Sequence, residues 1–374
     1  MNILFIGPYR QNDGWGLASQ SYIKALGTTG HNITTRPVFL AGGDAGLEDP
    51  EILGYENSFY DSYDMVIQKT LPHCLFLNRK FKKNIGLFVL ETNDISNSVA
   101  VHSINSMDEV WVPSEQEKKC LVKSGINKLI KVISQPIDTN FIKENINHKL
   151  DLHPLTKKTF KFYFIGEYVE RKNIKDLITA FHMAFSIDQP VSLILKTNIS
   201  GRSPQESKDL IEKDIQETKK KLGISSRYKK EIIITDRLSY QDIIGLHNAC
   251  DCFVAPSLGE SFCRPAAEAL CLGKTPIVTD NTGMIDFINK DNGFIVQSHR
   301  TPVLLNQRTL SNDFDMQNAN EYWYKISIYD LIEKMRSAYT MHKQDRKTYE
   351  NKQQLGIDSI EQFSYSNIGN KLCI

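Results

Sequence analysis

The segment GESFCRPAAEAL, residues 259–270, carries two glutamates, Glu260 and Glu268, on either side of Pro265. Proline is favoured at the first position of a helix, because its missing N–H is one that a helix start leaves unpaired anyway. The segment therefore predicts a helix that begins at Pro265, with Glu260 in the preceding loop and Glu268 about one turn inside. Free backbone amides around residues 263–267 would then attract an anion such as a phosphate.

Carboxylates on both sides of such an anion site could accept hydrogen bonds from hydroxyl groups. Ribose and other sugars carry many hydroxyls, so the spacing suits a diphosphate that joins a ribose to a sugar. A simpler interpretation stays open from the spacing alone: Glu268 would only complement the helix dipole, and Glu260 would be a solvated loop residue.

The elements that must position this segment are short apolar runs separated by helical lengths. One series lies at 3–6, 33–40, 65–67, 86–90, 109–112 and 130–133, and a second at 160–166, 191–196, 231–235, 252–255 and 276–279. Strands that alternate with helices form a parallel sheet covered on both faces. We therefore predict an α/β protein with two doubly wound domains, and ligands at the carboxyl ends of the strands, in the cleft between the domains.

The polar stretch 145–159 separates the two series and is the candidate linker. We place an N-terminal domain at residues 1–150 and a C-terminal domain at 151–350, which agrees with about 150 residues per domain as a starting expectation. Residues 351–374 end in FSYSNIGNKLCI, whose spaced apolar residues predict a packed helix.

The composition is that of a globular protein without a charge bias. Hydrophobic residues make up 41% of the 374 residues, and 45 basic side chains against 44 acidic ones leave a net charge of +1. Such a balance gives no long-range attraction for nucleic acid, so no such partner is expected. The seven cysteines form no C-x2-C pair and no apolar run reaches 18 residues, which favours a cytoplasmic protein without a membrane span. Peripheral contact with the inner face of a membrane stays open.

Several segments together resemble a known family. With its flanks, SLGESFCRPAAEALCLGKTPIVTDNTGMIDFI resembles the E-x7-E region of retaining glycosyltransferases of the GT-B fold, in particular glycosyltransferase family 4, also called glycosyl transferases group 1. FIGEYVERKNIKDLITAF resembles the family's strand, loop and helix with a phosphate-binding lysine. LETNDISNSVAVHSINSMDEVWVPSEQEKKCLVKSGI, with VISQPID, resembles the segment that leads to the linker. FSYSNIGNKL resembles the closing helix that crosses back onto the N-terminal domain.

The resemblance implies a GT-B protein of two Rossmann-like domains that transfers a sugar from a nucleoside-diphosphate sugar to an acceptor hydroxyl, in glycan or glycolipid assembly. It implies that Glu268 binds the ribose, that Glu260 contacts the donor sugar at the reacting centre, and that Lys172 neutralises the diphosphate. The other implied donor-site residues are Gly14, Gly16, Arg171, Phe262, Cys263, Arg264, Thr282 and Gly283. Glu91 and His102 are acceptor-side candidates. The base pocket is expected near residues 236–238, and neither a metal nor another cofactor is expected.

One departure from the family pattern bears on activity. Glu167 stands where the family usually has an arginine, and a glutamate cannot stabilise a leaving diphosphate. Arg171 and Arg264 are the candidate replacements. A protein that binds a nucleotide sugar without transferring it is therefore an alternative.

Two other motifs indicate different chemistry less strongly. Gly14-x-Gly16-x-x-Ser19 resembles the fingerprint of NAD(P)-dependent oxidoreductases, but it lacks the third glycine, and the next strand ends without the acidic residue. Asp313-Phe314-Asp315 resembles the D-x-D of metal-dependent glycosyltransferases, although a solvated loop is the simpler interpretation.

Overall fold

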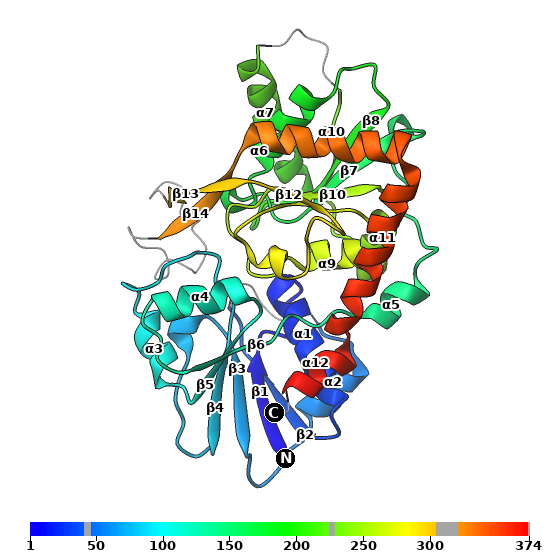
Figure 1. Ribbon diagram of the computed structural model, residues 1–374. Coiled ribbons are helices and arrows are strands. Elements are labelled where there is room, and N and C mark those ends of the chain that lie inside the picture. Colours follow the sequence, from blue (N-terminus) through cyan, green and yellow to red (C-terminus); the bar gives the residue numbers. More distant parts are fainter. Residues whose placement is uncertain (41–45, 224–228, 304–320, 373–374) are drawn as a thin grey trace.

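The computed structural model describes residues 1–40, 46–223, 229–303 and 321–372. The Asp313-Phe314-Asp315 motif lies outside these residues. The described chain forms two six-stranded sheets and one hairpin, with helices around them (Figure 1). The first sheet is built from residues of the first 132 positions, and the second from residues 160–296.

The first sheet has the strand order β2-β1-β3-β4-β5-β6, and all of its pairs are parallel. Its strands are β1 (Asn2–Gly7), β2 (Asn32–Pro37), β3 (Met65–Lys69), β4 (Lys83–Leu87), β5 (Glu109–Val112) and β6 (Leu129–Val132). Helices α1 (Gly14–Gly27), α2 (Pro50–Glu56), α3 (Ala100–Ser106), α4 (Glu115–Lys123) and α5 (Thr139–Glu144) accompany them. Both faces are covered, which explains why the strands read as continuous apolar runs.

The second sheet has the order β12-β11-β10-β7-β8-β9. Its strands are β7 (Phe160–Ile165), β8 (Val191–Lys196), β9 (Ile232–Ile234), β10 (Cys252–Ala255), β11 (Ile277–Thr279) and β12 (Phe294–Val296). Helices α6 (Ile174–Ala184), α7 (Pro204–Lys221), α8 (Tyr240–Ala249) and α9 (Arg264–Cys271) lie between them, and α10 (Ile328–Gln344) follows. The strand order reverses between β10 and β7, and such a switch point opens a crevice at the carboxyl ends of the strands.

Each of the eleven predicted apolar runs overlaps a strand, from β1 to β11. Strand β4 lies closer to the N-terminus than predicted, because it begins at Lys83 and ends at Leu87 instead of covering 86–90. Asn84 is polar but pairs with Asp108, its backbone N–H lying 2.7 Å from the Asp108 carboxylate, so the strand extends toward the N-terminus. Strand β12 was not predicted.

A hairpin that the sequence did not suggest joins the second sheet to α10. Strands β13 (Ser298–Pro302) and β14 (Tyr322–Ile326) pair antiparallel, with Thr301 opposite Trp323. In Figure 1 the hairpin projects from the second half to the level where the two halves meet. Its first strand is polar and ends in proline, which hid it from a search for buried strands.

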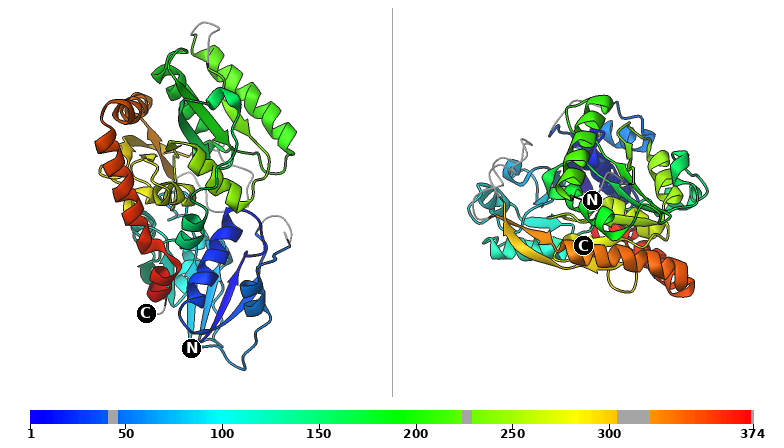
Figure 2. Two further views of the ribbon diagram at one scale, coloured as in Figure 1. Left: turned by 90° about the vertical axis from the view of Figure 1, so that its right-hand side faces the viewer. Right: turned by 90° about the horizontal axis from the view of Figure 1, so that it is seen from above.

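Two helices return the chain from the second half to the first. Helix α11 (Arg346–Ile360) packs along α9, and α12 (Tyr365–Leu372) packs on α1, as Figures 1 and 2 show. A Cβ on Gly369 of α12 would lie 2.4 Å from the carbonyl oxygen of Ala25, so the two helices touch backbone to backbone. The return passes the segment between β6 and α5, where the Ile137 N–H donates to the Phe363 carbonyl at 2.8 Å.

Candidate active site

Glu260 lies at the switch point of the second sheet, beside two cations. Its Oε2 is 2.7 Å from Lys172 Nζ and 3.2 Å from Arg171 Nη1, and its side chain is only 8% exposed. Lys172 ends a 3₁₀ turn, Glu170–Lys172, that follows β7, and Glu260 follows the adjacent β10. Burial alone would raise the pKa of Glu260, but the charges of Lys172 and Arg171 outweigh burial and hold the pKa below its ordinary value.

Arg171 also joins Glu260 to the other half of the molecule. Its Nη1 donates to the Gly259 carbonyl at 2.8 Å, and its Nη2 forms an ion pair with Glu91. Glu91 lies in the loop after β4 of the first sheet. The structure therefore brings a predicted acceptor-side residue and the predicted reacting-centre residue to the same arginine.

Glu268 is enclosed by protein side chains. Its Oε1 accepts from Arg264 Nε at 2.7 Å and from the Tyr240 hydroxyl at 3.0 Å, and His247 Nε2 lies 3.5 Å from Oε2. The side chain is 3% exposed. Burial would raise the pKa of Glu268, but Arg264 and His247 more than offset that and lower it. A ribose hydroxyl could reach this carboxylate only by taking the place of one of these partners.

Arg264 connects Glu268 to the first half. Its Nη1 is 3.2 Å from the Ser21 hydroxyl of α1, and its guanidinium lies over the Tyr240 ring, 4.9 Å from the centroid. Each of the two glutamates thus holds an arginine that also reaches across the seam, by which we mean the contact between the two halves. The two carboxylates do not pair with each other, as the sequence predicted.

Helix α9 begins at Arg264, one residue earlier than predicted, with Pro265 in its first turn. The expected set of free amides at 263–267 is smaller than predicted, because the N–H groups of Ala266 and Ala267 both approach the Cys263 carbonyl, at 3.0 and 3.4 Å. Cys263 has a φ of 66°, in the left-handed region that favours glycine.

Phe262 is a core residue by its side chain. Its ring packs against those of Phe287 and Phe363 with centroids 5.0 and 5.5 Å away, and it is buried. Only its backbone could face a ligand. The three packed rings hold the loop between β10 and α9 against the core.

Glycines at the seam allow backbone segments to touch. A Cβ on Gly283 would lie 1.7 Å from the Ser261 carbonyl oxygen, and one on Gly259 would lie 2.4 Å from the Glu91 carbonyl oxygen. The Gly283 N–H donates to the Glu260 carbonyl at 2.8 Å, while the neighbouring Thr282 hydroxyl donates to Thr279. Thr282 and Gly283 therefore lie beside Glu260.

The first loop differs from its expected form because Gly14 and Gly16 belong to the first turn of α1. A Cβ on Gly16 would lie 1.8 Å from the Gln11 carbonyl oxygen, so the chain's own turn already requires this glycine. A Cβ on Gly14 would meet nothing within 4 Å. Arg237, in the predicted base-pocket segment, donates to the Asn12 carbonyl at 2.6 Å and ties that segment to this loop.

Two further residues of the prediction do not pair with the glutamates of this cluster. Glu167 is exposed, and His102 is exposed on α3. Within the described ranges, neither side chain has a hydrogen bond or ion pair to Glu260, Glu268 or Glu91. The sequence did not point to four residues that lie at the site, namely Tyr240, His247, Glu117 and Trp323. Only Trp323 stands out in the sequence, because it lies in the aromatic run YWY at 322–324.

Glu117 extends the carboxylate cluster on the first half. It is buried on α4, its Oε1 accepts from the Leu90 N–H, and burial raises its pKa well above the ordinary value. The Ser261 hydroxyl lies close enough to lower that pKa in part, yet neither Glu117 Oε2 nor Ser261 Oγ completes a hydrogen bond. A small cavity at the seam is lined by both halves, namely by residues 90–93, Gln116, Glu117, Gly259, Glu260, Asn281 and Thr282.

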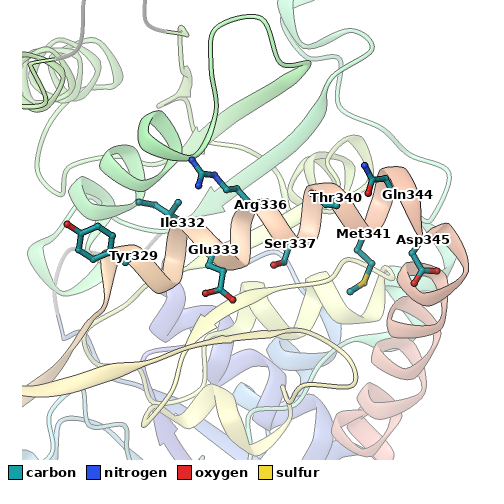
Figure 3. A pocket seen from close by; sticks show the side chains of 9 residues that line it. All are labelled: Tyr329, Ile332, Glu333, Arg336, Ser337, Thr340, Met341, Gln344 and Asp345. Atoms are coloured by element: carbon teal, nitrogen blue, oxygen red, sulfur yellow. The ribbon is translucent and has the colours of Figure 1, made fainter.

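A larger hollow of about 570 Å³ lies elsewhere, along the outer side of α10 (Figure 3). It is lined by α10 residues from Tyr329 to Gln344 and by Asp345. Arg336, one of these, donates to the carbonyls of Met183 and Ala184 and so packs α10 on α6. Its charged lining residues are Glu333, Arg336 and Asp345.

In the described ranges no three or more His, Cys, Asp or Glu side chains are placed to hold a metal ion. The same ranges contain no helix with the length and apolarity needed to cross a membrane.

Comparison with known proteins identifies residues 147–309 as a match to the family "Glycosyl transferases group 1". A curated relative is the capsular polysaccharide biosynthesis glycosyltransferase CapM of Staphylococcus aureus, 24% identical over 204 residues, 52% of this chain and 50% of the relative. The chain thus spans about half the length of the curated relative it matches.

Similar solved structures extend over the whole chain. Anabaena HepE in complex with UDP and glucose has a TM-score of 0.63 at 16% identity, covering 100% of this chain and 98% of its own. Sucrose-phosphate synthase of Thermosynechococcus elongatus has a TM-score of 0.65 at 14% identity, with coverages of 100% and 97%. An E. coli trehalose-6-phosphate protein bound with UDP-2-fluoro glucose has a TM-score of 0.67 at 9% identity, with coverages of 100% and 98%. The predicted GT-B fold, with two Rossmann-like halves, is confirmed.

Proposed function

We propose, on the premise that residues 147–309 belong to glycosyl transferases group 1, that this protein is a retaining glycosyltransferase. It would move a sugar from a nucleoside-diphosphate sugar to an acceptor hydroxyl. The observation that carries the proposal is the position of Glu260, 2.7 Å from Lys172 at a strand switch point and joined through Arg171 to Glu91 of the other half. HepE binds UDP and glucose, which makes a UDP sugar the first donor to test.

The leaving diphosphate needs positive charge fixed in advance, and Lys172 and Arg171 supply it in this proposal. Glu167 removes the arginine usual in the family. Arg171 is the replacement that geometry favours, because it shares Glu260 with Lys172, whereas Arg264 is held on Glu268. Neutralisation by two protein cations makes a metal unnecessary in this proposal.

The ribose would bind on the Glu268 side. A carboxylate that already accepts from Arg264 and Tyr240 is ionised and oriented, so ribose hydroxyls replacing one of these partners would find an acceptor in place. Such an exchange links nucleotide binding to the Arg264–Ser21 contact at the seam.

The acceptor would enter from the first half, near Glu91. The departing phosphate oxygen would take the acceptor proton on the same face of the sugar, as proposed for the family, so that no separate base is needed. Closure of the seam would exclude water, which otherwise hydrolyses the donor. The CapM relative, whose name refers to capsular polysaccharide biosynthesis, supports a role in glycan or glycolipid assembly. A cytoplasmic location with peripheral membrane contact is part of the proposal and rests on no comparison.

A nucleotide-sugar-binding protein without transfer is the second candidate, and Glu167 is the observation that favours it. Release of UDP from UDP-glucose, measured beside UDP binding, separates the two functions. Binding without turnover for any nucleotide sugar would favour the second.

The site assignment is tested with Glu268→Ala and Glu260→Ala. Loss of one charge-assisted hydrogen bond between Glu268 and the ribose predicts at least about a tenfold weaker UDP affinity in Glu268→Ala, whereas Glu260→Ala should lower transfer more than UDP affinity. Thermal shift against UDP concentration measures the affinity, because stabilisation grows with the ratio of ligand to Kd.

Glu109→Ala is the matched control, since Glu109 is equally buried and paired with Lys83 and Lys131 but lies at the opposite end of its strand from the seam. It should lower Tm and leave the UDP response intact. Equal UDP affinity in the wild type and both site variants would refute the assignment.

A further inference from the structure

The β13–β14 hairpin is anchored to the loop that carries Glu260. The Tyr324 N–H donates to the Leu258 carbonyl at 2.7 Å, and Trp323, 2% exposed, forms a buried apolar cluster with Leu258 and Val303. Gly259 packs against the indole, because a Cβ there would lie 3.0 Å from Trp323 Cδ1. The hairpin is therefore attached to Leu258 and Gly259, the two residues that precede Glu260.

The same hairpin holds the loop of the first half that carries Glu91. The indole Nε1 of Trp323 donates to the Glu91 carbonyl at 2.9 Å, and Asn93 Nδ2 donates to the Tyr322 carbonyl at 3.3 Å. Lys123 of α4 lies over the Tyr322 ring, 4.8 Å from its centroid. Three side chains or backbone groups of the first half thus rest on two consecutive hairpin residues.

These contacts close into a ring that passes through both glutamate loops. Trp323 binds the Glu91 carbonyl, the Glu91 carboxylate binds Arg171, and the Arg171 carbonyl accepts from the Leu258 N–H at 2.7 Å. Leu258 in turn binds Tyr324, the neighbour of Trp323. Glu91 is thus held at both its backbone carbonyl and its side chain, and has little conformational freedom. Residues around a reacting centre need such fixed positions.

We propose that Trp323 is a positioning residue, which fixes the Glu91 loop against the Glu260 loop and so sets where the acceptor hydroxyl meets the donor sugar. This inference rests on the proposed transfer. The β13–β14 hairpin then belongs to the acceptor side of the active site, although it is part of the second half of the chain.

Trp323→Phe tests the proposal, because phenylalanine keeps an aromatic ring among Leu258 and Val303 and removes only the N–H donor. Loss of one buried hydrogen bond should lower the rate of UDP release from UDP-glucose about five- to tenfold, with UDP affinity unchanged. Trp111→Phe is the matched control: Trp111 is buried and donates to Glu109 at 2.5 Å, away from the seam. It should lower Tm and leave the rate unchanged.

A double-mutant cycle with Glu91→Gln shows whether Trp323 acts through Glu91. If it does, the double variant is no slower than Glu91→Gln alone, because coupled residues are not additive. Multiplied losses, or an equal loss in Trp111→Phe, would overturn the proposal.

A second readout does not depend on turnover. Backbone amides at 90–93 should exchange hydrogen faster in Trp323→Phe than in the wild type, and at the wild-type rate in Trp111→Phe. Unchanged exchange in Trp323→Phe overturns the positioning role. If the wild type binds UDP but turns over no nucleotide sugar, the proposed function is refuted. The hydrogen-exchange result then decides whether Trp323 fixes the Glu91 loop.

Discussion

Gly259→Ala should separate the two halves by a distance that the structure sets. The added Cβ would lie 2.4 Å from the carbonyl oxygen of Glu91, and ordinary van der Waals contact begins at 3.4 Å, so one segment must retreat by about 1 Å. Both atoms belong to, or sit directly on, the main chain, so no side-chain rotation relieves the clash. Trp323 opposes the retreat, because it holds the same carbonyl at 2.9 Å.

The cost divides between stability and rate. Overpacking of this kind costs about 1–3 kcal/mol, and a misplacement of about 1 Å at a reacting centre costs up to roughly a hundredfold in rate. We expect Tm to fall by a few degrees, and UDP release from UDP-glucose to fall about tenfold to a hundredfold. UDP affinity should change least, since Gly259 lies in the loop before α9, whereas Glu268 lies inside this helix.

Differential scanning calorimetry and steady-state kinetics on the same preparation measure both effects. Gly54→Ala is the control: this glycine lies in α2 with nothing within 4 Å of its would-be Cβ, so alanine there should stabilise the helix by about 0.5–1 kcal/mol and leave the rate unchanged. Wild-type Tm and rate in Gly259→Ala would refute the account of the seam as a tight backbone contact.

Two further predictions concern buried charges away from Glu260. Glu231 forms ion pairs with His182 and, at 2.7 Å, with Lys219. Burial would raise the pKa of Glu231, but these two partners outweigh burial and lower it. The ionised Glu231 therefore stabilises the folded protein above the ordinary glutamate pKa, and this contribution is lost as pH falls through the pKa of the folded state. Denaturant unfolding should therefore show Glu231→Gln less stable than wild type by about 3–5 kcal/mol at pH 7, with a difference that shrinks in acid; a constant difference would contradict the pairing. Lys69 is buried against Trp15, and burial lowers its pKa to about 7 despite Asp13. The free energy of unfolding should rise between pH 7 and 10 by up to about 1.4 kcal/mol per unit, and Lys69→Met should lose that rise; the same slope in both proteins would refute it.

The apolar runs were enough to predict β1 to β11, because strands of a parallel sheet that is buried on both faces are continuous apolar runs in the sequence. The same holds for α9, whose start is marked by Pro265. Within the site, the position of Glu260 between a strand and α9 followed from the order of elements, whereas the role of Lys172 was implied only by the resemblance. The structure brings the two together because the adjacent parallel strands β7 and β10 end at the same edge of the sheet.

What could not be predicted depends on side chains that meet across the seam. Arg264 and Ser21 are 243 positions apart, and Trp323 and Glu91 are 232 apart, so no local pattern connects them. The enclosure of Glu268 by Tyr240 and His247 depends on how α8 packs on α9. The hairpin was missed because its first strand is polar and ends in proline, and so gives neither an apolar run nor a helical period.

The packing of α12 on α1 has a consequence for how the chain is made. The two helices touch at Ala25 and Gly369, and Ile368 and Leu372 of α12 are buried in the same core as Tyr22 and Leu26 of α1. At ribosomal speeds of about 5–20 residues per second, α12 emerges roughly 20–70 s after α1. For that interval α1 can pack on β1, β2 and α2 but lacks the cover of α12, so the first sheet can pair its strands early but must complete this part of its core late. Exposure of this apolar side of α1 during synthesis is therefore expected from this one helix contact.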